Sequence, residues 1–384
     1  MEREASTLSR RRFAQLVGAG AAFAALQRPT LSIDARGQRP SVARDAAPFA
    51  RVASPVVRLS SNENPYGPSP AALRAMTDAF GLSWRYPDEH QDALAEELSK
   101  MHGVSAGQIL LGDGSGEILK LAAAAFTGPG RALVVADPTF EAIAHHARTA
   151  RAEVAAVRLT ADYRHDLPKM LTAAGGAGLV YVCNPNNPTA SLTPKGEVRA
   201  FLSKLSRETF VLVDEAYFHY VESADYESLI PLVRDYPNLV VARTFSKIYG
   251  MAGLRCGYCV AQEATVERLR AQQSWDSVNI MALVAALASV RDPSHVEQGR
   301  RLNGEVKAHV CAELDKLGLS YIPSAANFMM IDMRREVRPV LASMRRAGVE
   351  VGRFFPSLPN HMRVTVGTRE EMQAFLAALR QVTA

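Results

Sequence analysis

Short apolar runs, each followed by glycine or polar residues, recur along the middle of the chain, and this alternation limits its possible folds more than any other feature. The runs are 109–111, 132–136, 179–183, 210–213 and 239–242. Apolar runs of this length are typical of strands that are buried on both faces. Because helical stretches separate most of them, they predict an α/β fold with a three-layer, doubly wound and mostly parallel sheet. Two later runs, 327–332 and 362–366, predict strands of a smaller α+β domain at the C-terminal end.

The length of 384 residues is sufficient for two domains with separate cores. Prolines recur at Pro29, Pro40, Pro48 and Pro55, which is typical of a linker without stable structure. We therefore predict five parts: a signal at 1–28, a linker at 29–58, an N-terminal arm at 59–75, a large domain at 76–285 and a small domain at 286–384.

The first residues resemble a twin-arginine export signal. Arg10 and Arg11 precede Arg12 and Phe13, and a weakly apolar run follows as far as Leu26. This run is shorter than the ~20 residues that a membrane span needs, so no stable membrane anchor is expected. Twin-arginine signals are receptor-read addresses for folded, cofactor-loaded proteins, which predicts a periplasmic location. The alternatives are a basic tail without fixed structure on a cytoplasmic protein and a mitochondrial-type presequence.

The net positive charge comes from the N-terminal part of the chain. The whole chain has 44 Lys and Arg against 39 Asp and Glu, and residues 1–51 hold nine of the former and four of the latter. The remainder therefore has 35 charges of each sign and no net charge. Since the backbone of a nucleic acid binds a basic surface, we do not expect a nucleic-acid partner.

The four cysteines are too few and too scattered for a disulfide framework. Cys256 and Cys259 have the spacing of a redox pair, but they lie in the apolar run GLRCGYCVA. Residues three apart on a strand face opposite sides, which favours buried structural cysteines. His145 and His146 are neighbours on a predicted helix and point in different directions. No other spacing is typical of metal ligands, so we expect no metal site.

Lys247 follows the apolar run 239–242, and Ser246 and Arg255 flank it. Ligand sites in open α/β sheets lie at the carboxyl ends of the strands. A lysine in a half-buried cleft can lose its proton near neutral pH and form a Schiff base with a carbonyl. A hydroxyl and a guanidinium together can hold a phosphate. This combination suits pyridoxal phosphate, which has an aldehyde and a phosphate; the alternative is an exposed lysine in a glycine-bearing loop.

The glycine-rich turn 112–116 lies between an apolar run and a predicted helix. Free N–H groups and the helix dipole make such a helix start a phosphate site. The spacing GxGxG differs from the dinucleotide fingerprint GxGxxG, so a dinucleotide is not indicated. A tight structural turn is the alternative.

Polar and aromatic residues follow the other apolar runs: Phe140, Asn187, Asp214 and Tyr217. A carboxylate beside a pyridine nitrogen keeps it protonated, so that the ring accepts carbanion electrons. Groups at the ring hydroxyl tune the imine, and an aromatic side chain covers the ring. Together with Lys247, these residues supply what a pyridoxal phosphate site requires. Taken singly, Asp214 could cap a segment, Tyr217 could belong to the core and Asn187 could form a turn.

Nine motifs, in the same order as in a known family, are spread along most of residues 59–372. They are NENPYGPSP, WRYPD, GDGSGE, PTF, CNPNNPT, VDEAY, RTFSKIYGMAGLRCGY, SAANF and HMRVTVGTREE. The chain resembles the fold-type I pyridoxal-phosphate aminotransferases of class I/II, and among them the histidinol-phosphate aminotransferase family. The resemblance implies an enzyme that transfers an amino group from an amino acid or an amine phosphate to a 2-oxo acid such as 2-oxoglutarate.

The resemblance also implies the residues that hold the cofactor. Lys247 would form the Schiff base and move the proton at the substrate α-carbon, Asp214 would pair with the pyridine nitrogen, and Tyr217 would bond the ring hydroxyl. The cofactor would also contact Ser115, Gly116, Phe140, Asn187, Ser246 and Arg255.

Substrate and subunit contacts are implied in the same way. Arg363 would bind the α-carboxylate of the substrate, and Asn64 and Tyr66 would be further substrate residues. Tyr86 would reach the cofactor phosphate of the neighbouring subunit, which implies a homodimer with shared sites.

Two positions depart from the family pattern. Ala190 stands where the family usually has glycine, and Ala374 stands eleven residues after Arg363, where some histidinol-phosphate enzymes have an arginine for the substrate phosphate. Arg353 is a candidate substitute. Histidinol phosphate and aromatic or other apolar amino acids are therefore both candidate donors. A decarboxylase or racemase on the same fold is a further alternative, whereas the signal and linker at 1–58 disfavour a regulator with a DNA-binding domain.

Overall fold

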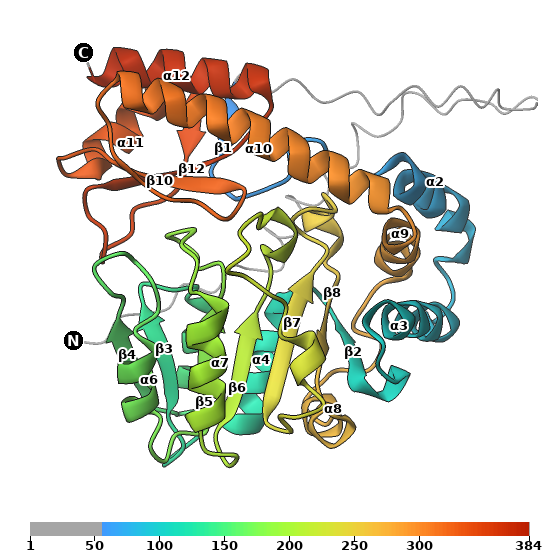
Figure 1. The fold of residues 1–384 in the computed structure, drawn as a ribbon. Coiled ribbons are helices and arrows are strands. Elements are labelled where there is room, and N and C mark those ends of the chain that lie inside the picture. Colours follow the sequence, from blue (N-terminus) through green and yellow to red (C-terminus); the bar gives the residue numbers. More distant parts are fainter. Residues whose placement is uncertain (1–55, 384) are drawn as a thin grey trace, which may run out of the picture. The chain divides into compact units, whose positions relative to one another are not determined.

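The computed structural model describes residues 56–383. Residues Ser54–Ala384 form one compact unit (Figure 1). The predicted signal and residues 29–55 of the predicted linker lie outside the described residues. Within the described part, no helix is long and apolar enough to cross a membrane.

A seven-stranded sheet forms the centre of the larger part of the fold, in the order β2-β8-β7-β6-β5-β3-β4. Its strands are β2 (Ile109–Gly112), β3 (Leu133–Asp137), β4 (Val154–Arg158), β5 (Leu179–Cys183), β6 (Phe210–Asp214), β7 (Leu239–Thr244) and β8 (Gly257–Val260). Only β8 runs antiparallel to its neighbours; the other pairs are parallel. The predicted α/β fold with a mostly parallel sheet is thus confirmed.

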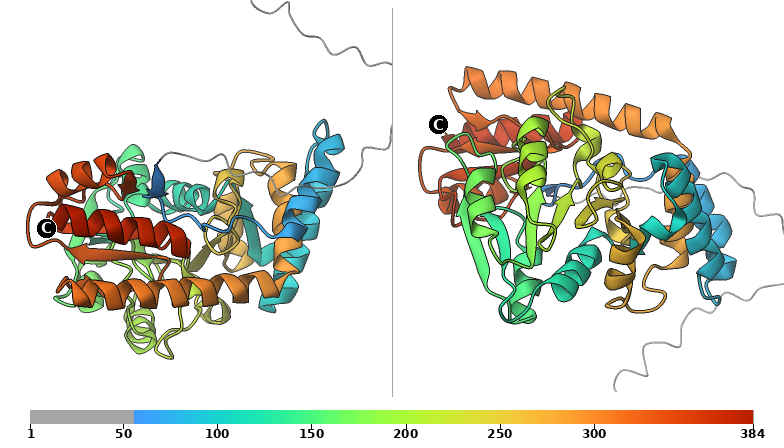
Figure 2. Two further views of the ribbon diagram at one scale, coloured as in Figure 1. Left: turned by 90° about the horizontal axis from the view of Figure 1, so that it is seen from above. Right: turned by 60° about the horizontal axis from the view of Figure 1, so that its bottom comes forward.

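Helices cover both faces of this sheet, which gives the three predicted layers (Figures 1 and 2). The helices whose buried residues share a core on one face are α2 (Pro70–Ala79), α3 (Asp88–His102), α6 (Leu167–Ala173), α7 (Lys195–Lys204) and α9 (Ile280–Val290). Those on the other face are α4 (Ser115–Phe126), α5 (Ala142–Thr149) and α8 (Glu263–Arg270).

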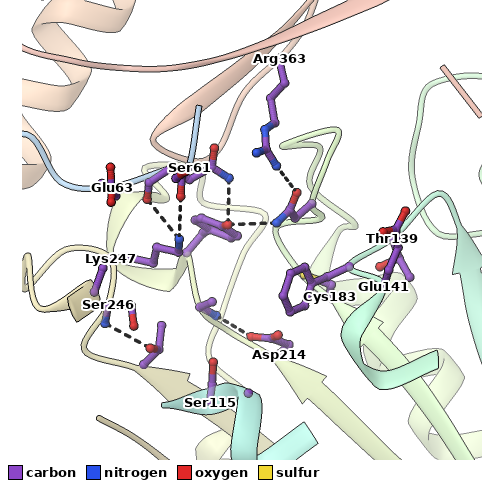
Figure 3. Close-up of a pocket in the computed structure, with 18 of the residues that line it drawn as sticks. Ser61, Glu63, Ser115, Thr139, Glu141, Cys183, Asp214, Ser246, Lys247 and Arg363 are labelled. Atoms are coloured by element: carbon purple, nitrogen blue, oxygen red, sulfur yellow. Dashed lines mark hydrogen bonds between the residues drawn. The ribbon is translucent and has the colours of Figure 1, made fainter. Parts of the chain in front are cut away.

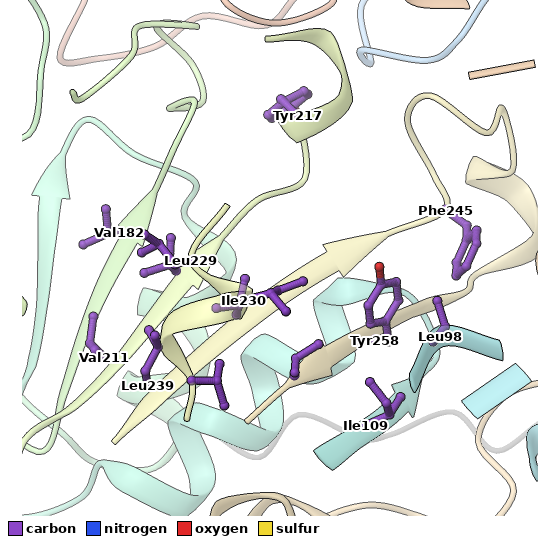
Figure 4. Packing of buried hydrophobic residues seen from close by; sticks show 14 of the residues in the cluster. Leu98, Ile109, Val182, Val211, Tyr217, Leu229, Ile230, Leu239, Phe245 and Tyr258 are labelled. Carbon is purple, nitrogen blue, oxygen red and sulfur yellow. The ribbon is translucent and has the colours of Figure 1, made fainter. Parts of the chain in front are cut away.

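Successive strand residues enter opposite cores, and this alternation sets the register of the sheet. On β5, Val180 and Val182 lie in one core (Figure 4), while Tyr181 and Cys183 lie in the other. Full burial of each large apolar side chain contributes roughly 1.5–3 kcal/mol. A shift by one residue would exchange the two faces, so the pairing is strongly specified.

The cysteines in and beside β8, which lies between β2 and β7, also face opposite sides of the sheet. Cys256 packs in the core that contains α7, and Cys259 packs in the core that contains α4. Both thiols are free. Among residues 56–383, no three His, Cys, Asp or Glu side chains are arranged to hold a metal ion.

The smaller part of the fold has an antiparallel sheet in the order β12-β10-β9 and a parallel pair, β1-β11. Its strands are β1 (Val57–Leu59), β9 (Tyr321–Ile322), β10 (Phe328–Asp332), β11 (Val349–Val351) and β12 (His361–Thr365). Three helices complete it: α10 (Pro293–Lys316), α11 (Val337–Arg346) and α12 (Arg369–Thr383). Residues 57–58, which we predicted as the end of the linker, instead form part of β1, because Val57 and Leu59 pair with β11 across almost 300 residues of sequence.

Helix starts follow local capping signals. In α2 (Pro70–Ala79), the Ser69 hydroxyl accepts a hydrogen bond from the N–H of Ala72 at 3.1 Å, and Pro70 occupies the first turn. The residues between β8 and β9 form three helices, α8, α9 and α10. Asn279 and Asp292 cap the second and third of these helices with their side chains, which explains the breaks.

Candidate active site

A cavity of about 380 Å³ lies at the carboxyl ends of the large-sheet strands, and residues from the smaller sheet also line it. Ten residues predicted from the sequence line this cavity: Ser115, Gly116, Phe140, Asn187, Asp214, Tyr217, Ser246, Lys247, Arg255 and Arg363. Figure 3 shows Lys247, Asp214 and Arg363 approaching it from different elements. The structure therefore brings together side chains that are up to 248 residues apart in the sequence.

Lys247 lies in the loop after β7, at the edge of this cavity. Its ammonium group donates a hydrogen bond to the backbone oxygen of Asn62 at 3.1 Å. Burial lowers the pKa of Lys247 to about 8, and the positive charges of Arg363 and Arg255 act in the same direction. With this pKa, about a tenth of the amine is neutral at pH 7, and the neutral form is the one that attacks a carbonyl.

Asp214 ends β6, and both of its carboxylate oxygens have hydrogen-bond donors. The Tyr181 hydroxyl donates to Oδ2 at 2.9 Å, and the N–H of Ala216 donates to Oδ1 at 3.0 Å. Burial raises the pKa of Asp214 to about 6, although these two hydrogen bonds oppose the shift. A cation beside the carboxylate, such as a protonated pyridine nitrogen, would favour its ionised form.

Tyr217, Asn187 and Arg363 form a continuous hydrogen-bonded chain across the cavity. The side-chain amides of Asn187 and Asn62 donate to the Tyr217 hydroxyl at 3.2 and 3.1 Å. Arg363 donates to Oδ1 of Asn187 at 2.9 Å and to the backbone oxygen of Ser60 at 2.8 Å. The remaining nitrogen of this guanidinium, Nε of Arg363, is buried and has no hydrogen-bond partner within the described residues. This chain orients the ring of Tyr217 and the guanidinium of Arg363 relative to Lys247.

The opposite end of the cavity is built for an anion. Ser115 and Gly116 begin α4, so their N–H groups have no partner within the helix and can bind an anion. Arg255 donates to the Ser246 hydroxyl at 3.3 Å, and its guanidinium packs against the turn before α4. A Cβ on Gly114 would lie 2.3 Å from Nη2 of Arg255. Glycine is therefore required there for the guanidinium and the helix start to converge.

Three predicted site residues are not in the cavity of this chain. Asn64 is buried beside it: its side chain donates to the backbone oxygen of Ile248 at 2.7 Å and accepts from the N–H of Tyr66 at 3.0 Å. Within one chain Asn64 therefore acts on the position of the lysine loop, and its contact with the substrate stays a prediction. Tyr66 is 41% exposed and Tyr86 is 80% exposed, and neither is among the residues that line the cavity.

Several functional residues were not predicted. Asn62 lies in a recognised motif but carried no assigned role, and Tyr181 looked like one more residue of an apolar strand. The pairing of β5 with β6 places Cys183 opposite Asp214, and Tyr181 faces the same side as Cys183. Glu141 and Phe355 also line the cavity; no local pattern marks them, because the tertiary fold alone brings them there.

Ala190, at the position where glycine was expected, adopts a left-handed backbone conformation with φ of 57°. Its N–H donates to the backbone oxygen of Asn186 at 2.8 Å, and its own oxygen accepts from Ala325 at 2.8 Å. The turn is therefore kept with alanine, at a cost of roughly 1–2 kcal/mol relative to glycine. Asn187 remains in the cavity.

The donor set of the cavity fits pyridoxal phosphate. Lys247 supplies an amine for the aldehyde, Asp214 a carboxylate for the ring nitrogen, and Tyr217 and Asn187 groups for the ring hydroxyl. The start of α4, Ser246 and Arg255 supply donors for the phosphate. These groups occupy different sides of one cavity, as the two ends of the cofactor require.

Comparison with known proteins agrees with this geometry. Residues 54–379 match the family described as aminotransferase class I and II. The chain belongs to this family. The histidinol-phosphate aminotransferase of Symbiobacterium thermophilum is 43% identical to this chain over 329 residues, which are 85% of this chain and 90% of that protein. The histidinol-phosphate aminotransferase of Moorella thermoacetica is 39% identical over 333 residues, 86% of each chain.

Solved structures show the same likeness. The crystal structure of histidinol-phosphate aminotransferase from Sinorhizobium meliloti, in complex with pyridoxal-5'-phosphate, matches with a TM-score of 0.81 at 28% identity, over 85% of this chain and 91% of that one. The fold-type I architecture and the histidinol-phosphate branch of the family are thus confirmed. The enzyme is a pyridoxal-phosphate-dependent aminotransferase.

We predict that Tyr181→Phe weakens cofactor binding. The substitution removes the Tyr181 hydroxyl, whose hydrogen bond stabilises the ionised carboxylate of Asp214. The pKa of Asp214 should therefore rise further above its ordinary value. Asp214 is ionised above its pKa, and the effect should therefore be largest near pH 6–7 and smaller at pH 9. The expected increase in the dissociation constant of pyridoxal phosphate at pH 7 is about tenfold, measured by titration of the cofactor-free enzyme.

Tyr236→Phe is the matched control, because this tyrosine stacks with Arg207 away from the cavity. An equal effect of both substitutions, or an effect of Tyr181→Phe that does not change with pH, would contradict the assigned role of Tyr181.

Proposed function

We propose that the enzyme transfers the amino group of an amino acid or an amine phosphate to a 2-oxo acid such as 2-oxoglutarate, in the manner of the histidinol-phosphate aminotransferases. The observation that carries this proposal is the position of Arg363. It is fixed by Asn187 and Ser60 and shares the cavity with the amine of Lys247. A guanidinium so placed can bind a substrate carboxylate through two hydrogen bonds and hold the α-carbon near the lysine.

Four residues of the cavity have defined tasks in this reaction. Bound pyridoxal phosphate supplies an electron sink for the charge that develops at the α-carbon. Lys247, with its lowered pKa, takes the α-proton and returns it during amino transfer. Asp214 holds the positive charge of the pyridine nitrogen, and Tyr217 hydrogen-bonds the ring hydroxyl. Arg363 keeps the substrate carboxylate in place, which favours loss of the proton over loss of carbon dioxide.

The identity of the donor depends on how the side chain of the substrate is bound. The names of the relatives support histidinol phosphate. Ala374 lies on α12 and is not among the residues that line the cavity, so it cannot help to bind a phosphate. An aromatic or broad-specificity amino acid donor is the second candidate. Phe140 and Phe355 favour it, because they add aromatic surface to the cavity lining.

Lys247→Ala should abolish amino transfer and the visible absorbance of the bound cofactor, because no other amine lines the cavity within the described part of the chain. Lys195→Ala is the control, since this lysine bonds the backbone of Ala224 at the surface. The wild-type enzyme should be assayed with 2-oxoglutarate against histidinol phosphate and aromatic amino acids. Full activity of Lys247→Ala, or release of carbon dioxide without any need for a 2-oxo acid, would contradict the proposed reaction.

The enzyme is further proposed to act as a homodimer in which Tyr86 of each subunit reaches the other subunit's cofactor phosphate. Large apolar side chains are exposed near Tyr86: Phe80 is 61% and Trp84 72% exposed. Such a patch is typical of a surface that a partner covers.

This arrangement predicts complementation between two inactive variants. Lys247→Ala and Tyr86→Ala each damage the sites of their own homodimers. In a mixed dimer, one site has the intact lysine of one subunit and the intact tyrosine of the other, so mixing should restore activity. A mixture that stays as inactive as its components after subunit exchange would contradict a shared site.

Export through the twin-arginine route is proposed from the residues that precede the described part of the chain. Replacing Arg10 and Arg11 by lysine keeps the positive charge but removes the guanidinium pair. The variant should stay in the cytoplasm, while wild type is found in the periplasmic fraction. The same distribution for both proteins would refute the signal.

A further inference from the structure

Arg243 and Glu215 form a buried ion pair, and the reaction described above does not use it. Nη2 and Nε of Arg243 donate to Oε2 of Glu215 at 2.8 and 3.0 Å. Nη2 also donates to the Ser228 hydroxyl at 2.8 Å. The side chains of Arg243 and Glu215 are only 6% and 1% exposed, and neither residue lines the cavity. Any effect of the pair on the reaction must therefore pass through the residues that it holds.

The pair joins the carboxyl ends of β6 and β7, the two strands that lead to Asp214 and Lys247. Asp214 lies opposite Ala242 in the parallel pairing of these strands. The N–H of Glu215 donates to the backbone oxygen of Ala242 at 2.9 Å, and Arg243 is the next residue of β7. The ion pair thus adds side-chain hydrogen bonds to the backbone ladder at the point where the two strands reach the cavity.

Glu215 lies between two residues that line the cavity, Asp214 and Ala216. The N–H of Ala216 donates to Oδ1 of Asp214 at 3.0 Å. In addition to the ion pair, both carboxylate oxygens of Glu215 have donors: Oε1 accepts from the N–H of Leu229 at 2.7 Å, and Oε2 accepts from the Ser228 hydroxyl at 2.9 Å. A displacement of this carboxylate would therefore move the backbone that carries Asp214.

Arg243 is held in a similar way on the strand that leads to the reactive lysine. Its guanidinium carbon lies 3.8 Å from the centre of the Phe218 ring, which fixes the plane of the side chain. Thr244 follows it and lines the cavity, and the Thr244 hydroxyl accepts from the N–H of Ser246 at 3.1 Å. Lys247 is the next residue. The buried guanidinium therefore anchors the segment that presents the lysine.

We propose that the ion pair between Glu215 and Arg243 is a positioning device that fixes the separation of Asp214 from Lys247. This inference rests on the proposed function, because it takes these two residues as the partners of the ring nitrogen and the aldehyde of the cofactor. Two hydrogen bonds from one guanidinium fix direction as well as distance. A displacement of about 1 Å can reduce the rate of an enzyme about a hundredfold, so a rigid connection between the two strand ends matters for the reaction.

A pair that only stabilised the fold would not need to be ionic. Two charges that are removed from water carry a large desolvation penalty, and two apolar side chains of similar volume are often as stabilising. The surroundings would accept them: Val241, on the same side of β7, and Tyr258, opposite Arg243 on β8, both lie in the apolar core. Apolar contacts lack direction, whereas hydrogen bonds fix an angle.

Binding of the cofactor tests the proposal without turnover. The cofactor-free full chain is titrated with pyridoxal phosphate. Glu215→Gln keeps the shape of the side chain but removes its charge, and Arg243→Lys keeps the charge but not the two directed bonds. Each substitution should raise the dissociation constant of pyridoxal phosphate about tenfold, because Asp214 and Lys247 no longer keep their separation.

Arg291→Lys is the matched control. Arg291 bonds Glu97 with the same two nitrogens, since Nε and Nη2 both donate to Oε2, at 2.9 and 2.6 Å. Its side chain is 59% exposed and does not line the cavity. This substitution should leave the affinity for the cofactor unchanged. An equal loss of affinity in Arg291→Lys and Arg243→Lys would overturn the proposal.

The double variant Glu215→Gln/Arg243→Met separates position from stability. Arg243→Met alone leaves a buried carboxylate without its partner and should lower the melting temperature, whereas the double variant leaves no such charge and should melt close to wild type. Its affinity for pyridoxal phosphate should stay about tenfold lower, because the directed bonds are still absent. Recovery of that affinity together with the melting temperature would show a purely stabilising pair and overturn the proposal.

Kinetics then separate this proposal from the proposed function. Arg243→Lys should lower kcat about tenfold and leave KM for the 2-oxo acid nearly unchanged, because Arg363 keeps its own hydrogen bonds. A higher KM with an unchanged kcat would contradict the positioning role. A wild-type enzyme that transfers no amino group to any 2-oxo acid contradicts the proposed function, while the titrations with pyridoxal phosphate still decide the role of the ion pair.

Discussion

The site depends on Asn62, which joins the N-terminal segment to both parts of the fold. Its N–H donates to the Thr365 hydroxyl at 2.9 Å, and its side chain donates to Tyr217. Its backbone oxygen accepts from both Lys247 and Asn327. The φ of Asn62 is 55°, a left-handed conformation that asparagine tolerates better than most residues. One residue thereby sets the distance between the lysine, the ring hydroxyl site and the smaller sheet.

Desolvation controls the electrostatics of the cavity. Burial moves the pKa of Lys247 down and that of Asp214 up, so each group is brought closer to its neutral form. A cofactor with a pyridinium nitrogen and an aldehyde suits both shifts. Its positive nitrogen would stabilise the ionised carboxylate of Asp214, and its aldehyde reacts with the neutral amine of Lys247. Arg363 also lies mostly buried, and burial lowers its pKa from the ordinary value. A substrate carboxylate would replace the solvation that this guanidinium has lost.

The sequence was informative where chemistry follows a strand directly. Asp214 and Lys247 could be assigned because an apolar run predicts a buried strand and the carboxyl ends of parallel strands share one edge. Tyr181 and Glu141 could not, because their roles depend on which strands are neighbours and on how the smaller sheet lies against the larger one. Tyr86 is the opposite case: a sequence motif contains it, but in a single chain its side chain is 80% exposed and its predicted role needs a second subunit.

The sequence by itself determined the fold class, the family and most of the groups that meet in the cavity, because apolar periodicity and strand-end motifs are local properties. Only the tertiary structure decided how the substrate half of the cavity is built. Arg353 was a candidate without a known direction, and its contact with Glu141 arises because the segment after β11 lies beside the segment between β3 and α5. Contacts between segments more than 200 residues apart depend on that packing, and no local pattern records it.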